Sequence, residues 1–174
     1  MLAQDSIGRP IFSFIVLFLA IGYYITGSAT WGYQSRWMNP RYVQFRLFEG
    51  MHNITQAELA TYDGVQQKQI YLAVNGMVFD VSSSPQKYGP MGSYWFFAAK
   101  DAARAFATGC FQQDLTHDLR GLPSQMLDAV AGWQRFFLNN VNYWHVGYVH
   151  HPPLTGTPPP LCEAARRTAG SLKS

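Results

Sequence analysis

The chain of 174 residues has little charge, only two cysteines and no run of basic side chains. Charged residues make up 13% of the sequence and the formal net charge is +3, with the positive charges scattered, which argues against a nucleic-acid-binding surface. Cys110 and Cys162 lack the C-x-x-C or Cys/His spacing of a zinc site, and their different surroundings lead us to expect two free thiols. No nucleophile is paired with a base in the sequence and no nucleotide-binding loop is recognisable, so we do not expect an enzyme.

One long apolar run stands out near the N-terminus. Residues 11–25 carry no charged side chain, and the run continues through small residues to Trp31. Its roughly 20 residues are enough for a helix to cross the hydrocarbon core of a membrane. Tyr23, Tyr24, Trp31 and Tyr33 lie toward its C-terminal end, where aromatic side chains favour the lipid headgroups. We therefore predict a tail at 1–10 and a transmembrane helix at 11–31, surrounded by membrane lipid.

The charges beside this run indicate its orientation. Arg9 precedes it, whereas Arg36, Arg41 and Arg46 follow it. Because positive flanks favour the cytosolic side, we expect the C-terminal part of the chain to lie in the cytosol.

A cleaved signal peptide is the alternative interpretation of the same run. Gly27 and Ala29 are small residues at a plausible cleavage position, and Asn53-Ile54-Thr55 is an N-glycosylation acceptor sequence. A secreted, signalling-type protein would then result.

The rest of the chain has the pattern of one small α+β domain. We expect a connector at 32–52, a domain at 53–150 and a Pro-rich, disordered tail at 151–174. Thr55 and Glu58 have capping-box spacing, and Asn75-Gly76 between two β-rich runs predicts a hairpin. Helices are expected within 101–108 and 123–138, and a last strand at 143–149. The apolar positions of the longer helix are Met126, Val130, Trp133 and Phe137, which we interpret as core.

A loop that bears glycines and two tyrosines leads into the first of these helices. Tyr88 and Tyr94 flank Gly89 and Gly92, and glycine lets a backbone approach a flat ligand closely. A phenol oxygen can bind ferric haem as the phenolate. Taken by themselves, however, tyrosines in such a loop are more commonly packing residues with hydrogen-bonded hydroxyl groups.

Ordered sequence blocks between about 55 and 149 resemble the membrane-associated progesterone receptor component family, within the cytochrome b5-like haem/steroid-binding superfamily, and look most like its fungal members. The blocks are Tyr62-Asp63-Gly64, residues 70–76, residues 78–82, Tyr88-Gly89-Pro90, Gly92-Ser93-Tyr94, Phe97-Ala98, Asp101-Ala102, Arg104-Ala105, residues 107–110 and residues 114–116.

The resemblance implies a cytochrome b5-like α+β fold and a haem b whose iron is held by Tyr94. It also implies that Tyr88 and Tyr143 flank the haem and that Gly92 belongs to the haem-binding loop. The implied partners are a sterol ligand, a membrane cytochrome P450 or another membrane protein, and a second copy of the chain in a haem-mediated homodimer. The implied roles are sterol metabolism, cytochrome P450 support and haem handling, at an endoplasmic reticulum or mitochondrial membrane. The same pocket could instead bind a sterol or another apolar ligand without haem.

The sequence departs from the family pattern at a few positions. Asn142 stands where a basic residue is frequent, Ala99-Lys100 replaces Gly-Arg, and Met91 replaces Gly or Glu. The His-Pro-Gly-Gly motif of conventional cytochrome b5 is missing, which argues against a pair of histidine ligands. Of the five histidines, only His117 and His145 lie where a ligand is conceivable. We interpret Asp114, Asp118 and Arg120 as a surface ion cluster.

Overall fold

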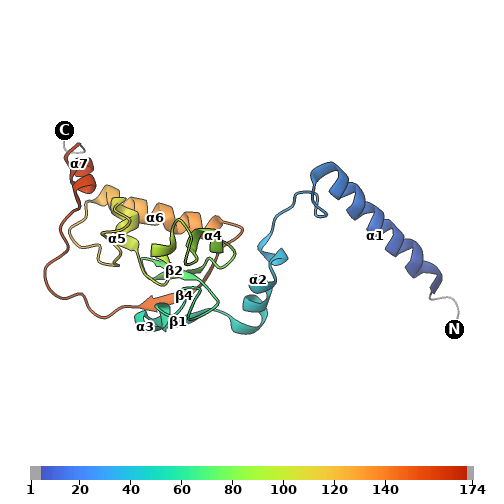
Figure 1. The fold of residues 1–174 in the computed structure, drawn as a ribbon, viewed down its shortest axis with the longest axis horizontal. Coiled ribbons are helices and arrows are strands. Elements are labelled where there is room, and N and C mark those ends of the chain that lie inside the picture. The colour runs from blue at the N-terminus through green and yellow to red at the C-terminus, as the bar shows by residue number, and fades with distance from the viewer. Residues whose placement is uncertain (1–4, 172–174) are drawn as a thin grey trace. The chain divides into compact units, whose positions relative to one another are not determined.

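The computed structural model describes residues 5–171, which divide into one unit up to Met38 and a second unit from Asn39 onward. In the first unit, helix α1 (Asp5–Thr26) contains a 19-residue stretch, Gly8–Thr26, that is long and apolar enough to cross a membrane (Figure 1). After Thr26 the chain turns back, and the Trp31 ring packs against Gly22, where a Cβ atom would lie only 2.6 Å from Nε1 of the indole. The helix therefore begins at Asp5, before the predicted start at residue 11, and ends at Thr26, before the predicted end at residue 31. A 3₁₀ turn at Arg36–Met38 closes this unit.

The second unit is built on a four-stranded sheet. Its strands are β1 (His52–Thr55), β2 (Tyr71–Val74), β3 (Met77–Asp80) and β4 (Trp144–His150), in the order β1-β4-β3-β2. β1 runs parallel to β4, and the other pairs are antiparallel. Asn75 and Gly76 both have positive φ, 51° and 81°, so the predicted tight hairpin turn is confirmed.

Helices lie on both sides of the sheet and beyond it (Figure 1). They are α2 (Pro40–Gln44) with a π-helical turn at Phe45–Glu49, α3 (Gln56–Leu59), α4 (Pro85–Tyr88), a 3₁₀ turn at Trp95–Phe97, α5 (Ala103–Thr108), the longer α6 (Ser124–Asn139), and α7 (Glu163–Ser171). The last of them, α7, lies beyond the sheet, next to the end of α6 (Figure 1). Thr55 and Glu58 form the predicted capping box at α3. The architecture is the expected α+β fold.

The core has two main parts. One part joins Phe79 of β3 to Phe106 of α5 and Phe137 of α6, and the other contains Phe45, Leu59 and Trp144. Because Phe45 is only 1% exposed and belongs to the second part, residues 39–51 are a piece of the domain. The predicted connector at 32–52 is therefore too long.

The C-terminal tail is attached to the domain, in contrast to the expected disorder. Cys110 and Cys162 form a disulfide, so the expectation of two free thiols is wrong. Cys162 and Ala165 are buried against Met126 of α6, and α7 follows directly. Tail and domain are thus joined by a covalent bond and by a small apolar cluster.

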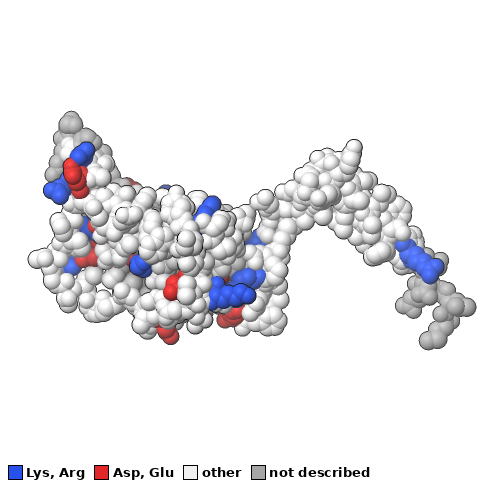
Figure 2. Space-filling view, viewed as in Figure 1, with Lys and Arg blue, Asp and Glu red and all other residues white. Residues whose placement is uncertain are grey.

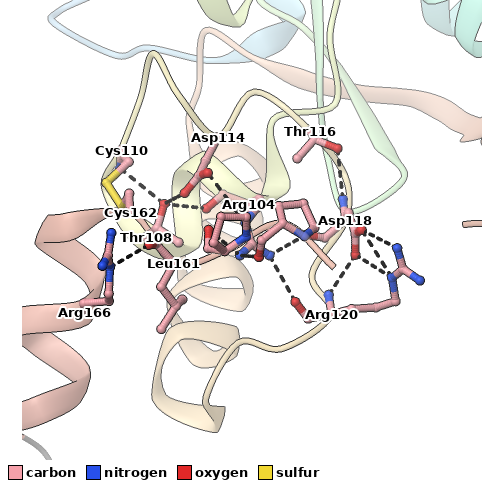
Figure 3. A network of polar contacts seen from close by, with 12 residues as sticks. Arg104, Thr108, Cys110, Asp114, Thr116, Asp118, Arg120, Leu161, Cys162 and Arg166 are labelled. Carbon is pink, nitrogen blue, oxygen red and sulfur yellow. Dashed lines mark hydrogen bonds and ion pairs between the residues drawn. A yellow bond between two sulfur atoms is a disulfide. The ribbon is translucent and has the colours of Figure 1, made fainter. Parts of the chain in front are cut away.

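A buried arginine completes this attachment (Figure 3). Arg104 is fully buried and donates hydrogen bonds to the carbonyl oxygens of Asp118 and Pro159, at 2.9 and 2.6 Å. Its Nε atom lies 3.6 Å from Oδ1 of Asp114. A buried guanidinium needs such partners because an unpaired charge is costly in an apolar interior.

The acidic residues at this place are not on the surface. Asp114 and Asp118 are 6% and 5% exposed, so the predicted surface ion cluster is wrong for both. Hydrogen bonds from Arg120 lower the pKa of Asp118 to about 2. The two carboxylates can be buried because each one has a guanidinium partner. Asp114 also accepts a hydrogen bond from the hydroxyl of Thr108.

Candidate functional site

Three tyrosines meet in an aromatic cavity of about 300 Å³ beside α4, α5 and α6. The lining side chains are those of Lys87, Tyr88, Tyr94, Phe97, Phe106, Phe111, Trp133, Phe136, Phe137 and Tyr143. The cavity lies at the lower end of the size range of small-molecule pockets, so a larger flat ligand would be enclosed on part of its surface only.

Tyr88 and Tyr143 form the buried side of the cavity. Tyr88 ends α4 and Tyr143 directly precedes β4, and their rings pack edge-on at 5.8 Å. The Tyr143 hydroxyl is hydrogen-bonded to that of Ser84 at 3.1 Å. Burial, followed by the nearby Tyr143 with its hydrogen bond, raises the pKa of Tyr88 above its ordinary value. Tyr88 is therefore held as a neutral phenol.

Tyr94 differs from these two tyrosines. It is 43% exposed, and within residues 5–171 its hydroxyl oxygen has no hydrogen-bond partner. Its ring lies 6.3 Å from Tyr88 and 6.2 Å from Phe97. The oxygen of Tyr94 is thus the most exposed phenol oxygen donor among the three tyrosines of the cavity.

Gly92 shapes the loop that carries Tyr94, but it does not line the cavity. A Cβ atom at Gly92 would lie 2.2 Å from the carbonyl oxygen of Lys87, and the Tyr94 amide donates to the same oxygen at 2.7 Å. The missing side chain therefore lets the loop fold back onto α4. The approach of this loop backbone to a ligand stays a prediction.

The five histidines are placed elsewhere. His145 has its Nε2 atom 2.8 Å from the carbonyl oxygen of Gly147, and His117 stacks on His151 with ring centroids 3.7 Å apart. His52 and His150 belong to β1 and β4. None of them lines the tyrosine cavity. The donor set present there, a half-exposed phenol between aromatic walls, fits a haem with a single oxygen ligand.

Sequence reasoning missed several residues of this cavity. Phe106 and Phe111 form walls, and Lys87 brings a positive charge to the rim. Trp133 and Phe137 belong to the core, as predicted, but they also line the cavity, whereas Met126 and Val130 do not. The position of Lys87 directly before Tyr88 could have indicated its place in the cavity. The contribution of the phenylalanines depends on the tertiary fold.

Tyr88 also lines a larger cavity of about 690 Å³, which has more polar walls. His117, His151 and Asp101 line it, and Tyr94 and Tyr143 do not. We place the candidate site in the smaller cavity because it brings together the three tyrosines that the sequence singled out.

Comparison with known proteins identifies the domain that contains this cavity. Residues 55–149 match the family model described as "Cytochrome b5-like Heme/Steroid binding domain". Membrane steroid-binding protein 2 of Arabidopsis thaliana is 43% identical over 98 residues, 55% of this chain and 41% of that protein. Neuferricin of Xenopus tropicalis is 45% identical over 100 residues, 56% of this chain and 36% of that protein.

Human membrane-associated progesterone receptor component 2 is 39% identical over 90 residues, 49% of this chain and 40% of that protein. The matched region thus spans less than half the length of these relatives. A solved Arabidopsis thaliana protein described as having a cytochrome b5 like fold is 33% identical, with a TM-score of 0.52 over 58% of this chain and 93% of that one. Since the family model covers more than half of the sequence, the chain belongs to the cytochrome b5-like heme/steroid-binding domain family.

Proposed function

We propose that this chain is a membrane-anchored haem-binding protein in which Tyr94 is the axial ligand of a b-type haem and Tyr88 and Tyr143 support the site. The observation that carries the proposal is the contrast among the three tyrosines: Tyr88 and Tyr143 are buried, and the Tyr143 hydroxyl donates to that of Ser84, whereas Tyr94 is half-exposed and its hydroxyl has no hydrogen-bond partner among residues 5–171. A bound haem would supply ferric iron, whose charge favours loss of the phenol proton.

The chain's own residues have distinct tasks in this proposal. The walls formed by Phe97, Phe106 and Trp133 exclude water from the ligand. The buried Tyr88 keeps its proton, and Tyr88 and Tyr143 offer hydroxyl groups for hydrogen bonds. Lys87 stands at the rim, where an ammonium group can attract a ligand carboxylate. It can substitute for the basic residue that Asn142 replaces.

The expected roles are binding rather than catalysis: haem handling, or support of sterol metabolism through a membrane cytochrome P450 or another membrane protein. A haem-mediated homodimer belongs to the same proposal, because the half-exposed Tyr94 leaves one side of the site open. The endoplasmic reticulum membrane is the proposed location, with α1 as the anchor.

A sterol is the second candidate ligand, because the cavity walls are mostly aromatic and several relatives are named steroid-binding proteins. A sterol needs no iron ligand, so removal of the Tyr94 oxygen should leave sterol binding largely unchanged. Loss of the oxygen should abolish most haem binding.

The test is haem titration of the full-length chain in detergent, followed by absorption spectroscopy. Tyr94→Phe keeps the ring and should remove the ferric haem spectrum. Tyr148→Phe is the matched control, because Tyr148 is similarly exposed, at 46%, and lies on β4 away from the cavity. A wild-type spectrum from Tyr94→Phe, or a low-spin spectrum typical of two histidine ligands in the wild-type protein, would contradict the proposal.

A further inference from the structure

The position of the disulfide has consequences for where the domain can fold. Cys110 follows α5 and Cys162 precedes α7, with a sequence separation of 52. They are the only cysteines of the chain, so every thiol is consumed in this one bond.

The fold brings the two sulfur atoms together by contacts that do not involve sulfur. Arg104, which is labelled in Figure 3, donates to the carbonyl oxygens of Pro159 and Pro160. Arg120 donates to those of Thr155 and Gly156. Ala165 is 1% exposed in the cluster with Met126. These hydrogen bonds hold the segment before Cys162 in one position. In that position the sulfur atom of Cys162 lies next to that of Cys110.

Persistent disulfides belong to oxidising compartments, whereas cytosolic thiols are kept reduced. The pair consumes all thiols of the chain, and Cys162 is buried while Cys110 is half-buried. The disulfide is therefore evidence about the side of the membrane on which the domain lies.

A second, independent observation concerns Asn53 in the acceptor sequence Asn53-Ile54-Thr55. Asn53 lies in β1, which is an edge strand because it pairs with β4 alone. Ile54 points into the core, and Asn53 and Thr55 are exposed. An acceptor sequence carries a glycan only if its asparagine is accessible, and the amide of Asn53 meets this condition.

The arginines that flank α1 predicted the opposite orientation. They amount to three positive charges after the span against one before it. The charges on the part of the chain drawn in Figure 2 are sparse and scattered, with no concentrated basic surface on the face shown. A covalent bond that requires an oxidising compartment outweighs a difference of this size.

We propose that the domain from Asn39 onward faces an oxidising compartment, the lumen of the secretory pathway or the cell exterior, and that Asn53 carries an N-linked glycan there. Two thiols lose two protons and two electrons to the disulfide of a thiol oxidoreductase, which is reduced to its dithiol. The Asn53 amide nitrogen bonds to the sugar of a lipid-diphosphate-linked oligosaccharide and loses a proton, and the lipid diphosphate leaves. This orientation is independent of a bound haem.

The experiment uses the full chain with a C-terminal epitope, expressed in a eukaryotic cell. Free thiols are trapped in acid and labelled with a polyethylene-glycol maleimide before and after reduction. We expect no labelling before reduction and two labels after it, with the epitope protected from protease in sealed microsomes. Two labels without reduction, or an epitope that protease removes, would overturn the orientation.

Glycan removal with an endoglycosidase tests the modification site separately. The wild-type chain and Thr55→Ser, which keeps the acceptor sequence, should shift by one glycan, and Asn53→Gln should not. A wild-type chain without a shift would overturn the assignment of Asn53, and the thiol and protease results would still decide the orientation.

Discussion

Asp101 and His151 are joined through Oδ2 and Nε2 at 2.9 Å, although they are 50 positions apart in the sequence. The same carboxylate accepts hydrogen bonds from the backbone amides of Asn75 and Gly76, at 3.0 and 2.7 Å, and from that of Ala103. One buried side chain thus connects the hairpin turn, the start of α5 and the first residue of the tail.

Replacing Asp101 with Asn should destabilise the domain by about 1.5–3 kcal/mol. Both carboxylate oxygens of Asp101 accept from backbone N–H groups, whereas an amide has one accepting oxygen and an NH₂ group that would face an N–H donor. Denaturant unfolding measures the effect. The exposed Asp128 on α6 offers a control, and Asp128→Asn should change the free energy of unfolding by less than about 0.5 kcal/mol. Equal effects of the two variants would show that the Asp101 contacts contribute little.

Ala99 has a φ of 62°, in the left-handed region, which glycine adopts at no steric cost. Relief of about 1–2 kcal/mol of backbone strain is partly offset by the larger entropy of an unfolded chain with glycine. Ala99→Gly should therefore stabilise the domain by about 0.5–1 kcal/mol in thermal or denaturant unfolding. Ala60, whose φ is −61°, is the matched position, and Ala60→Gly should not stabilise. A lower free energy of unfolding for Ala99→Gly than for the wild-type protein would contradict backbone strain at Ala99.

Tyr143→Phe and Tyr88→Phe should weaken haem binding less than Tyr94→Phe does. Each removes a hydroxyl group worth roughly 0.5–1.5 kcal/mol, which corresponds to a factor of about 2–13 in the dissociation constant, and leaves the iron ligand in place. Haem titration followed in the Soret region gives the three constants. A larger loss for Tyr88→Phe than for Tyr94→Phe would exchange the roles of the two tyrosines.

Stability should fall as the pH decreases below about 6.5. Burial, followed by the nearby His151, lowers the pKa of His117, and burial lowers that of His145. A histidine with a lowered pKa in the folded state binds fewer protons there than when unfolded. Its stabilising contribution is therefore complete above the unfolded pKa and is lost as the pH falls toward the folded one.

The variant His117→Gln should show a weaker decrease in the free energy of unfolding between about pH 7.5 and 5.5 than the wild-type protein. His150→Gln, at the exposed end of β4, is the control and should keep the wild-type dependence. Identical pH curves for all three proteins would mean that His117 titrates freely.

Local sequence patterns predicted the features that depend on neighbours in the chain. Asn75-Gly76 specified a turn, and Thr55 and Glu58 specified a helix start, because each pattern contains both partners of the interaction. The gathering of Tyr88, Tyr94 and Tyr143 in one cavity required the family resemblance, since Tyr143 lies 55 residues after Tyr88.

Long-range partners were the part that could not be predicted. A Pro-rich tail has no periodic apolar face, so nothing in its sequence indicated that Arg104 would bind its carbonyl oxygens. Asp114 and Asp118 were expected at the surface because carboxylates are rarely buried, and the guanidinium partners that allow their burial are known only from the fold.

The covalent link between Cys110 and Cys162 encloses α6 and β4 in one closed loop. A protease that cuts the backbone once inside this loop leaves the two fragments bonded to each other. β4 would also stay paired with β1 on one side and β3 on the other. The domain should therefore stay in one piece after a single backbone cleavage in this loop, which would help it persist on the proposed oxidising side of the membrane.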